Sequence, residues 1–300
     1  MKTRRIAFGL AAALAAGATG AGAVPATLDT ARIETLSGAR GQLDSASGVF
    51  KVSVPRDDLA VRARGVGLTP ALGLTSWAAF QPIEGGAMVM GDLVLTQEQV
   101  NPVMGAALDA GLEVTALHNH FLSESPRVMF MHVGGMGDPA ALATAVGKVF
   151  AEMRRSAGAR EAAQSPAIDP AKTTLDPRKI DAVLGRSGTL QGGVYKVVVG
   201  RSTTMHGAKL GSAMGVNTWA AFAGSDDHAV VDGDFAMLEG ELQGVLKALR
   251  AGGLEVVAIH QHMTNEEPRI VFLHYWGIGP TQVLARGLRA ALDRTAAATP

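Results

Sequence analysis

The chain of 300 residues contains no cysteine, few aromatic side chains and no excess of charge. The lack of cysteine excludes disulfide bonds, thiolate metal ligands and a lipid-modified N-terminal cysteine. Because 27 basic side chains balance 27 acidic ones, the charge does not favour nucleic acid or an anionic membrane surface as a partner. No later apolar run is long enough to span a bilayer. We therefore expect no nucleic-acid partner and no stable membrane anchor.

The N-terminus has the pattern of a secretory signal peptide over residues 1–23. Basic side chains at Lys2, Arg4 and Arg5 precede an apolar run over residues 6–16, and Ala21-Gly22-Ala23 forms a small-residue cleavage site. Removal of this segment would leave a slightly acidic mature chain. The sequence therefore predicts a periplasmic or secreted protein.

The rest of the chain contains the same unit twice. Residues 73–137 align without a gap on residues 215–279, and 25 of the 65 paired positions are identical, so the two copies share one fold. The stretch 156–177 between them is rich in alanine, serine, proline and charge, as in a linker. We predict a first repeat domain at residues 28–155 and a second at residues 178–296.

Hydrophobic patterning within each copy predicts the element order β-β-α-β-β-α. Thr96-Gln-Glu-Gln99 is a capping box that opens a helix ending near Ala110-Gly111. An amphipathic helix follows at residues 139–153, matched by 280–294 in the second copy. The fold class is therefore α+β, with two homologous, packed sheet-plus-helix domains. The predicted strands of the first copy cover residues 49–54, 87–95, 113–120 and 127–133.

Histidine is concentrated in the best-matched part of the repeat. Strand alternation puts His118 and His120 on one face, and His132 follows on the next strand. Imidazole is a good ligand for divalent transition metals, and His-x-His directs two rings into one pocket. The alternative is a structural role, in which the rings hydrogen-bond to backbone at the edge of the core. The pattern predicts a metal, zinc above others, held by His118, His120, His132, His260, His262 and His274.

The position of the third histidine leaves the site incompletely defined. If residues 120 and 127 close a simple hairpin, His132 pairs near Thr115, on the wrong face for His118. A site within each copy and a single site between the copies therefore both stay open. Glu124 and Glu266 are candidate fourth ligands or general bases, which in an enzyme would support metal-assisted hydrolysis.

Three further pairs of residues recur in both copies. Arg127 and Arg269 either bind an anionic ligand or pair with the neighbouring glutamates to stabilise the turn. Asp92 and Asp234 follow a glycine, which favours a turn or bulge, with a ligand-binding position as the alternative. The Trp-Ala-Ala-Phe segments at 77–80 and 219–222 are typical of core, the alternative being a platform on which a ligand stacks.

The repeated motifs resemble those of the LppY/LpqO-type family of secreted bacterial proteins, a family of unknown function. The resemblance rests on Trp77-Ala-Ala-Phe80, Gly91-Asp92, Ala116-Leu-His-Asn-His120 and Pro126-Arg-Val-Met-Phe-Met-His132. It implies an exported protein of two repeats and supplies no activity. The chain lacks the lipidated cysteine of the lipoproteins that name the family. We expect a metal-binding protein, with metal-dependent hydrolysis as its enzymatic form. The competing class is a non-catalytic cell-envelope module that binds a small ligand in the cleft between the repeats.

Overall fold

The computed structural model describes residues 27–157 and 168–296. The predicted signal peptide and residues 158–167 of the predicted linker lie outside these ranges. Within them, no helix combines the length and the apolar character needed to cross a bilayer.

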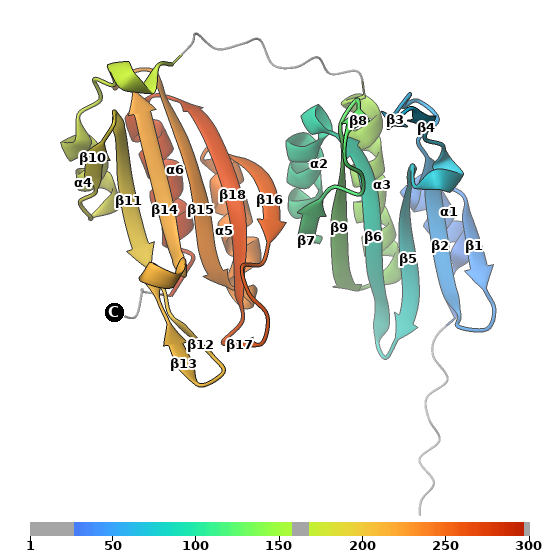
Figure 1. Cartoon of the computed structure of the whole chain (residues 1–300). Helices are drawn as coiled ribbons and strands as arrows, with labels where there is room; N and C mark the ends of the chain where they lie inside the picture. Colours follow the sequence, from blue (N-terminus) through green and yellow to red (C-terminus); the bar gives the residue numbers. More distant parts are fainter. Residues whose placement is uncertain (1–26, 158–167, 297–300) are drawn as a thin grey trace, which may run out of the picture.

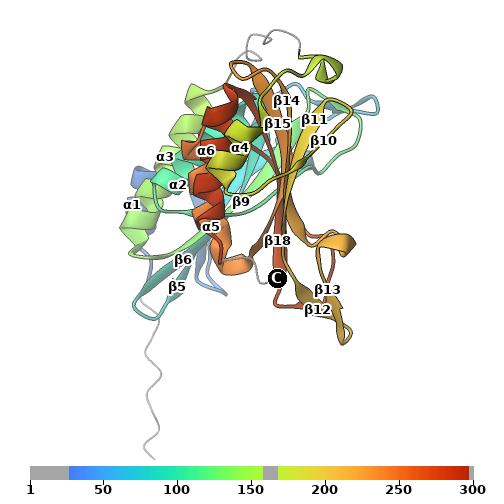
Figure 2. The same ribbon diagram turned by 90° about the vertical axis from the view of Figure 1, so that its left-hand side faces the viewer.

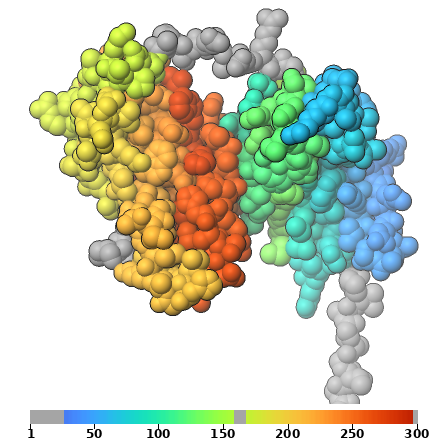
Figure 3. All heavy atoms as spheres, viewed as in Figure 1, coloured from blue at the N-terminus to red at the C-terminus, as the bar shows by residue number. Residues whose placement is uncertain are grey.

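Twelve antiparallel strands form one continuous sheet, with helices on one face and the other face open (Figures 1 and 2). Figure 3 shows the open face, with the C-terminal half in yellow to red beside the N-terminal half in blue to green. Across the first half the order is β1 (Gly41–Asp44), β2 (Val49–Pro55), β5 (Thr75–Ile83), β6 (Gly86–Thr96), β9 (Val128–Gly137) and β7 (Glu113–His118). The second half continues with β16 (Glu255–His260), β18 (Ile270–Gly279), β15 (Ala229–Leu238), β14 (Asn217–Gly224), β11 (Val194–Gly200) and β10 (Thr189–Gln191).

The helices begin where the sequence supplies caps. The predicted capping box is confirmed, because the Gln99 side chain accepts a hydrogen bond from Thr96 N at 3.0 Å. Asp138 caps the helix that follows with Pro139 at its first turn. The helices are α1 (Thr30–Ser37), α2 (Gln97–Asp109), α3 (Pro139–Arg155), α4 (Pro177–Leu184), α5 (Leu242–Ala251) and α6 (Thr281–Leu292), with 3-10 turns η1 (Pro70–Leu72), η2 (Pro170–Lys172), η3 (Ser212–Met214) and η4 (Glu239–Glu241).

Two three-stranded sheets lie at opposite ends of the molecule. One contains β3 (Arg62–Ala63), β4 (Val66–Gly67) and β8 (Glu124–Ser125). The other contains β12 (Thr203–Met205), β13 (Ala208–Leu210) and β17 (Glu266–Glu267). Figure 1 shows the first pair of labels, β3 and β4, at the top and the second, β12 and β13, at the bottom. The two halves therefore run in opposite directions across the sheet.

The halves join edge to edge rather than as separate packed sheets. β7 and β16 pair antiparallel, with Leu117 opposite Ile259. Two amide side chains strengthen this junction. Asn101 Oδ1 accepts a hydrogen bond from Val256 N at 2.9 Å. In the symmetric position, Gln243 Oε1 accepts from Val114 N at 3.0 Å and its Nε2 donates to Val114 O at 2.9 Å.

The predicted element order omits strands that the structure contains, β1 and β5 among them. The turn or bulge predicted at Gly91-Asp92 is wrong, because both residues lie inside β6 in regular pairing with β5 and β9. The glycine has another cause. A Cβ on Gly91 would stand 2.9 Å from Trp77 O and 3.0 Å from Val133 Cγ2, so close packing on the helix side requires its absence.

Candidate metal centres

The predicted metal ligands lie on the open face, in a row that crosses neighbouring strands. On the first half, Trp77 of β5 lies opposite Asp92 of β6, and Asp92 lies opposite His132 of β9. Directly opposed residues of antiparallel strands share a face, and alternation along β7 puts His118 on that face as well. The second half repeats the row with Trp219, Asp234, His274 and His260.

A β-bulge in each central strand brings the third histidine into the row. The register of β7 against β9 shifts between Val114 and Ala116, so that His132 lies opposite Ala116 rather than near Thr115. β16 has the same shift between Val256 and Ala258. One extra residue restores the shared face, so the wrong face expected from a simple hairpin is not adopted, and His132 lies two residues along from His118.

The second histidine of each His-x-His pair lies just beyond its strand. β7 ends at His118, two residues earlier than predicted, and β16 ends at His260. Stacking on a phenylalanine positions the next histidine instead. The His120 ring lies 3.4 Å from the Phe130 ring, centroid to centroid, and His262 lies 3.6 Å from Phe272.

In the second half, the polar atoms of four side chains converge. Asp234, His260 and His274 each offer one ligand atom, and these atoms all lie within 4.8 Å of one another. His262 Nε2 lies 3.1 Å from Asp234 Oδ2 and 3.1 Å from His260 Nε2. Two nitrogens bound at ~2.0–2.1 Å to a tetrahedral zinc ion lie ~3.3 Å apart. The two 3.1 Å distances from His262 Nε2 therefore fit edges of such a coordination sphere.

Buried polar atoms of this cluster lack partners among the residues that the structure describes. Asp234 is 3% exposed, and neither its Oδ1 nor His260 Nδ1 has a hydrogen-bond partner there. Burial lowers the pKa of His260 to about 4, with further lowering by His274 and His262. Burial raises the pKa of Asp234, opposed by His274 and His262. Leaving buried polar atoms unpaired is costly, and a cation bound among them would offset that cost.

In the first half, the same side chains are close but less converged. The His118 ring lies 5.1 Å from His120 and 5.0 Å from His132, centroid to centroid. His118 Nδ1 lies 3.4 Å from the backbone oxygen of Asn119. Asp92 is 8% exposed, and its Oδ1 has no hydrogen-bond partner in the described ranges. Burial lowers the pKa of His120; Asp92 raises it, and His118 and His132 lower it again.

The predicted glutamates make contacts of their own, although neither oxygen of Glu124 has a hydrogen-bond partner among the described residues. Glu124 lies in β8 with its side chain 1% exposed, and its Oε1 is 3.8 Å from Arg127 Nε. Glu266 Oε1 accepts a hydrogen bond from Ile270 N at 3.2 Å. The predicted Glu–Arg pair thus forms in the first half, and the second half uses its glutamate to hold the start of β18. The carboxylate that accompanies the histidines is an aspartate, Asp234, for which the sequence left a turn and a ligand-binding position open.

The prediction that the two Trp-Ala-Ala-Phe segments belong to the core is wrong for their tryptophans. Phe80 and Phe222 are buried as expected, but Trp77 and Trp219 are half-buried on the open face beside the aspartates. Strand alternation separates them, because residues three apart point to opposite faces. Lys51 Nζ lies 4.1 Å from the Trp77 ring centroid, and Lys196 Nζ lies 4.3 Å from that of Trp219.

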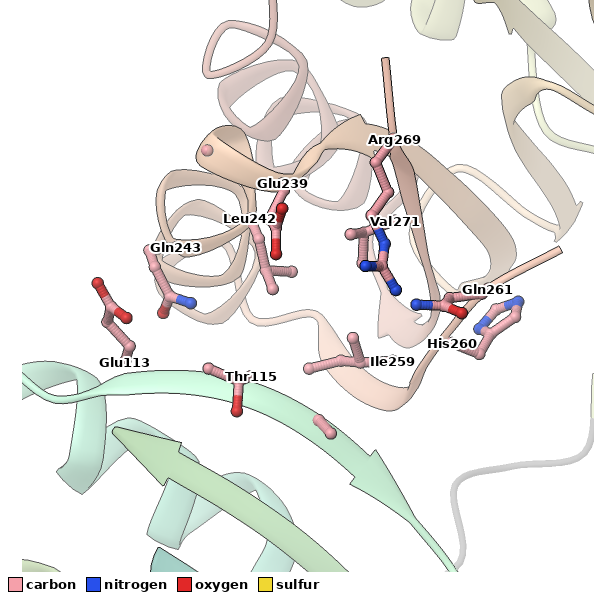
Figure 4. A pocket seen from close by; sticks show the side chains of 12 residues that line it. Glu113, Thr115, Glu239, Leu242, Gln243, Ile259, His260, Gln261, Arg269 and Val271 are labelled. Atoms are coloured by element: carbon pink, nitrogen blue, oxygen red, sulfur yellow. The ribbon is translucent and has the colours of Figure 1, made fainter. Parts of the chain in front are cut away.

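A pocket of about 650 Å³ lies at the junction of the halves. Glu113 and Thr115 line it from β7, and Gln243 lines it from α5. Figure 4 shows Arg269 and Gln261 pointing into this space, whereas the His260 ring turns to the side at its edge. The pocket and the histidine cluster are therefore neighbouring features that share His260.

Comparison with known proteins identifies a family whose function is not known. No curated protein matches the chain. A crystal structure of PduB, a trimeric bacterial microcompartment shell protein, aligns at 11% identity over 84% of this chain and 89% of that chain. Its TM-score of 0.21 is too low to support an argument. The model of the family described as Domain of Unknown Function (DUF1259) matches residues 31–152 and 178–294. The two matches coincide with the two halves of the sheet, and the chain belongs to this family.

Proposed function

We propose that each half of the protein binds one divalent transition metal ion, for which zinc is the best fit. Asp234, His260 and His274 are the ligands in the second half, with His262 as the fourth. Asp92, His118 and His132, together with His120, form the equivalent set in the first half. The observation that carries the proposal is the convergence of Asp234, His260 and His274 within 4.8 Å, where buried oxygen and nitrogen atoms have no partner in the described chain.

The chemistry of the donor set supports a transition metal over calcium or magnesium. Imidazole nitrogens and one carboxylate suit zinc, copper, nickel or iron, whereas the hard cations prefer sites made of oxygen. The lowered pKa of His260, about 4, keeps its imidazole neutral at neutral pH. A neutral ring is the form that binds a metal.

Metal-dependent hydrolysis is the enzymatic form of this proposal. A bound zinc ion supplies Lewis acidity and an activated water. In this form Asp234, His260 and His274 would hold the ion and leave one position open for water, and His262, whose Nε2 lies 3.1 Å from Asp234 Oδ2, would hold or move a proton beside it. Of the bases proposed from sequence, Glu266 accepts a hydrogen bond from Ile270 N, and Glu124 lies beside Arg127 with neither oxygen hydrogen-bonded among the described residues; we assign the role to His262 instead.

Export to the periplasm or the medium completes the proposal. It rests on the signal-peptide pattern of residues 1–23 and on the similarity to the LppY/LpqO-type secreted proteins. Intact-mass measurement of the exported protein should give an N-terminus near Val24. A full-length mass in the cytoplasmic fraction would exclude export.

Cobalt titration tests the metal proposal. Protein without a histidine tag is freed of metal and titrated with Co²⁺, whose visible absorption is intense in four-coordinate sites. We expect saturation at two ions per chain. His260→Ala combined with His274→Ala should remove about half of the absorption, and His206→Ala, which changes an exposed histidine in the β12–β13 turn, should remove none. Absence of binding at micromolar concentration would refute the proposal.

The junction pocket supports a second candidate, the binding of a small polar ligand between the halves. Arg269 extends into it and forms no ion pair within 4.0 Å in the part of the chain that the structure describes. Arg269→Met should abolish binding of such a ligand without altering the metal stoichiometry. Loss of metal in this variant would instead assign the pocket to the metal site.

A further inference from the structure

We propose that the open face carries an extended site for a ring-bearing organic anion beside each metal centre. In the first half it runs from the histidine cluster across Trp77 to the ammonium of Lys51, and in the second half across Trp219 to Lys196. This inference rests on the proposed metal function and names the ligand class of the same centres.

The two copies keep this row while changing the surface around it. Lys51, Trp77 and Asp92 recur unchanged as Lys196, Trp219 and Asp234. Other positions on the same face differ: Met90 becomes Asp232, Gly134 becomes Trp276 and Met136 becomes Ile278. An open face needs no particular side chain for packing. Among the positions that both copies keep on this face, Lys51, Trp77 and Asp92 lead in one row to the histidines, so a shared ligand accounts for this row better than stability does.

The lysines of the row are oriented by the indoles rather than neutralised by carboxylates. Their nitrogens lie 4.1 Å and 4.3 Å from the tryptophan ring centroids. Among described residues, no carboxylate oxygen lies within 4.0 Å of either lysine nitrogen, the limit for an ion pair. A cation–π contact restricts the ammonium but leaves its charge and its donors available. Each row therefore presents a positioned positive charge that an anion can bind.

The spacing of the row sets the size of the ligand. Lys51, Trp77, Asp92 and His132 occupy four successive strands, and neighbouring strands lie ~4.8 Å apart. The distance from the lysine strand to the strand of His132 is therefore roughly 14 Å, less at the side-chain ends. A single phosphate ion cannot bridge this span. A molecule with an anionic group at each end and a ring between them can reach the metal, the half-buried indole and the ammonium together.

A sugar and an aromatic ring are two sources of the same chemistry, and calorimetry with three probes distinguishes them. Fructose 1,6-bisphosphate represents the sugar, 4-carboxyphenylphosphonate the aromatic ring, and inorganic phosphate the anion alone. For the zinc-loaded protein, we expect one of the two ring probes to bind about tenfold more tightly than phosphate. Tryptophan emission should change on binding, because Trp77, Trp219 and Trp276, the three tryptophans of the chain, all lie on the open face.

Replacing the lysines gives the decisive comparison. The double variant Lys51→Met with Lys196→Met should lose the preference for the ring probe, with about a tenfold weaker Kd, the change expected for one charge-assisted contact. Lys148→Met with Lys247→Met changes two exposed lysines of the helical layer and should leave the Kd unchanged. Equal binding of ring probes and phosphate, or equal Kd values in both double variants, would overturn the inference.

Zinc content measured on the same samples separates this inference from the proposed function. If zinc binds at two ions per chain and the lysines have no effect, the anion site is refuted and the metal function stands. If zinc does not bind but the lysine-dependent preference remains in chelator, the anion site stands and the metal function is refuted.

Discussion

The two halves of the sheet share a set of side chains but differ in how closely these converge. In the second half, His262 Nε2 reaches Asp234 Oδ2 at 3.1 Å, and Asp234, His260 and His274 lie within 4.8 Å. In the first half, His118 instead directs Nδ1 toward the Asn119 backbone oxygen. Duplication has thus preserved the side chains, while their convergence differs between the halves. A preorganised site binds more tightly because less ordering accompanies binding.

The contacts at the starts of the helices that follow β6 and β15 differ as well. Arg201 in the second half pairs with Glu241 at 2.7 Å. Its counterpart Arg56 is buried, pairs with Asp58 at 2.8 Å and contacts the neutral Gln99 at 3.2 Å. An ion pair therefore holds the start of α5 through η4, where a neutral amide holds the start of α2. The halves can be compared by breaking each contact in turn.

Replacing the proposed metal-binding histidines should have the largest effect. It should also show which of the two sites binds metal more tightly. We expect His260→Ala with His274→Ala to abolish the tighter metal-binding event, and His118→Ala with His132→Ala to abolish the weaker one. Each pair should weaken its own site by at least ~100-fold, since two of four ligands are lost, whereas loss of a mere supporting contact costs ~10–100-fold. Calorimetry with Zn²⁺ measures both events. A pair that removed both events together would show a composite site between the halves.

Removing a side-chain hydrogen bond at the junction between β7 and β16 should have the next largest effect, on the free energy of unfolding. Gln243→Met leaves Val114 N and O without the hydrogen bonds of 3.0 Å and 2.9 Å that they share with the amide. We expect a loss of ~1–3 kcal/mol in the free energy of unfolding. Asn101→Leu should cost less, because one of its two bonds is long, at 3.4 Å. Denaturant unfolding gives both values, with exposed Gln97→Met as the control. Equal values for Gln243→Met and Gln97→Met would show that the amide does not support the junction.

The Arg201–Glu241 pair should give the start of α5 a pH dependence that the neutral Gln99 does not give the start of α2. Burial alone would raise the pKa of Glu241, but hydrogen bonds from Arg201, Ala296 N and Leu238 N lower it overall, below its ordinary 4.5. A carboxyl whose pKa is lower when folded stabilises the protein above the unfolded value and loses this contribution as pH falls through the folded value. Glu241→Gln, which mimics Gln99, should cost ~1–2 kcal/mol at pH 7. The Tm difference from wild type should shrink as the pH falls below about 4.5. A difference that does not change with pH would contradict the ion-pair account.

The lysine–tryptophan contacts should have the smallest effect on stability and the same effect in both halves. Their distances, 4.1 Å and 4.3 Å, are nearly equal, and an exposed cation–π contact contributes ~0.5–1 kcal/mol. Lys51→Met and Lys196→Met should therefore each lower the free energy of unfolding by no more than this. A cost above ~2 kcal/mol in either variant would assign that lysine a structural role.

Local patterns predicted much of each half. Alternation placed His118 on its face, the capping box located the start of α2, and the internal repeat gave two equivalent halves of an α+β fold. Each of these depends on residues close in sequence. The edge-to-edge pairing of β7 with β16 depends on contacts about 140 residues apart, as with Leu117 and Ile259, and periodicity carries no information about it.

The sequence could not decide the role of the two aspartates. Gly91-Asp92 looked like a turn because glycine and aspartate favour turns, yet the glycine accommodates close packing behind the sheet. Bringing Asp92 beside His132 requires the β6–β9 register, and bringing His118 to both requires the bulge at Thr115. One signal was available: the Gly-Asp pair recurs in both copies within an apolar, strand-like stretch.

Metal stoichiometry tests the central claim most directly. Elemental analysis of the wild-type protein, purified without a histidine tag and dialysed against micromolar Zn²⁺, should give two zinc ions per chain, one for each Asp-His-His-His set. His206→Ala should give the same value, and His260→Ala with His274→Ala should give one. A wild-type value of zero would contradict metal binding. A wild-type value of one that falls to zero both in this double variant and in His118→Ala with His132→Ala would contradict independent sites in the two halves.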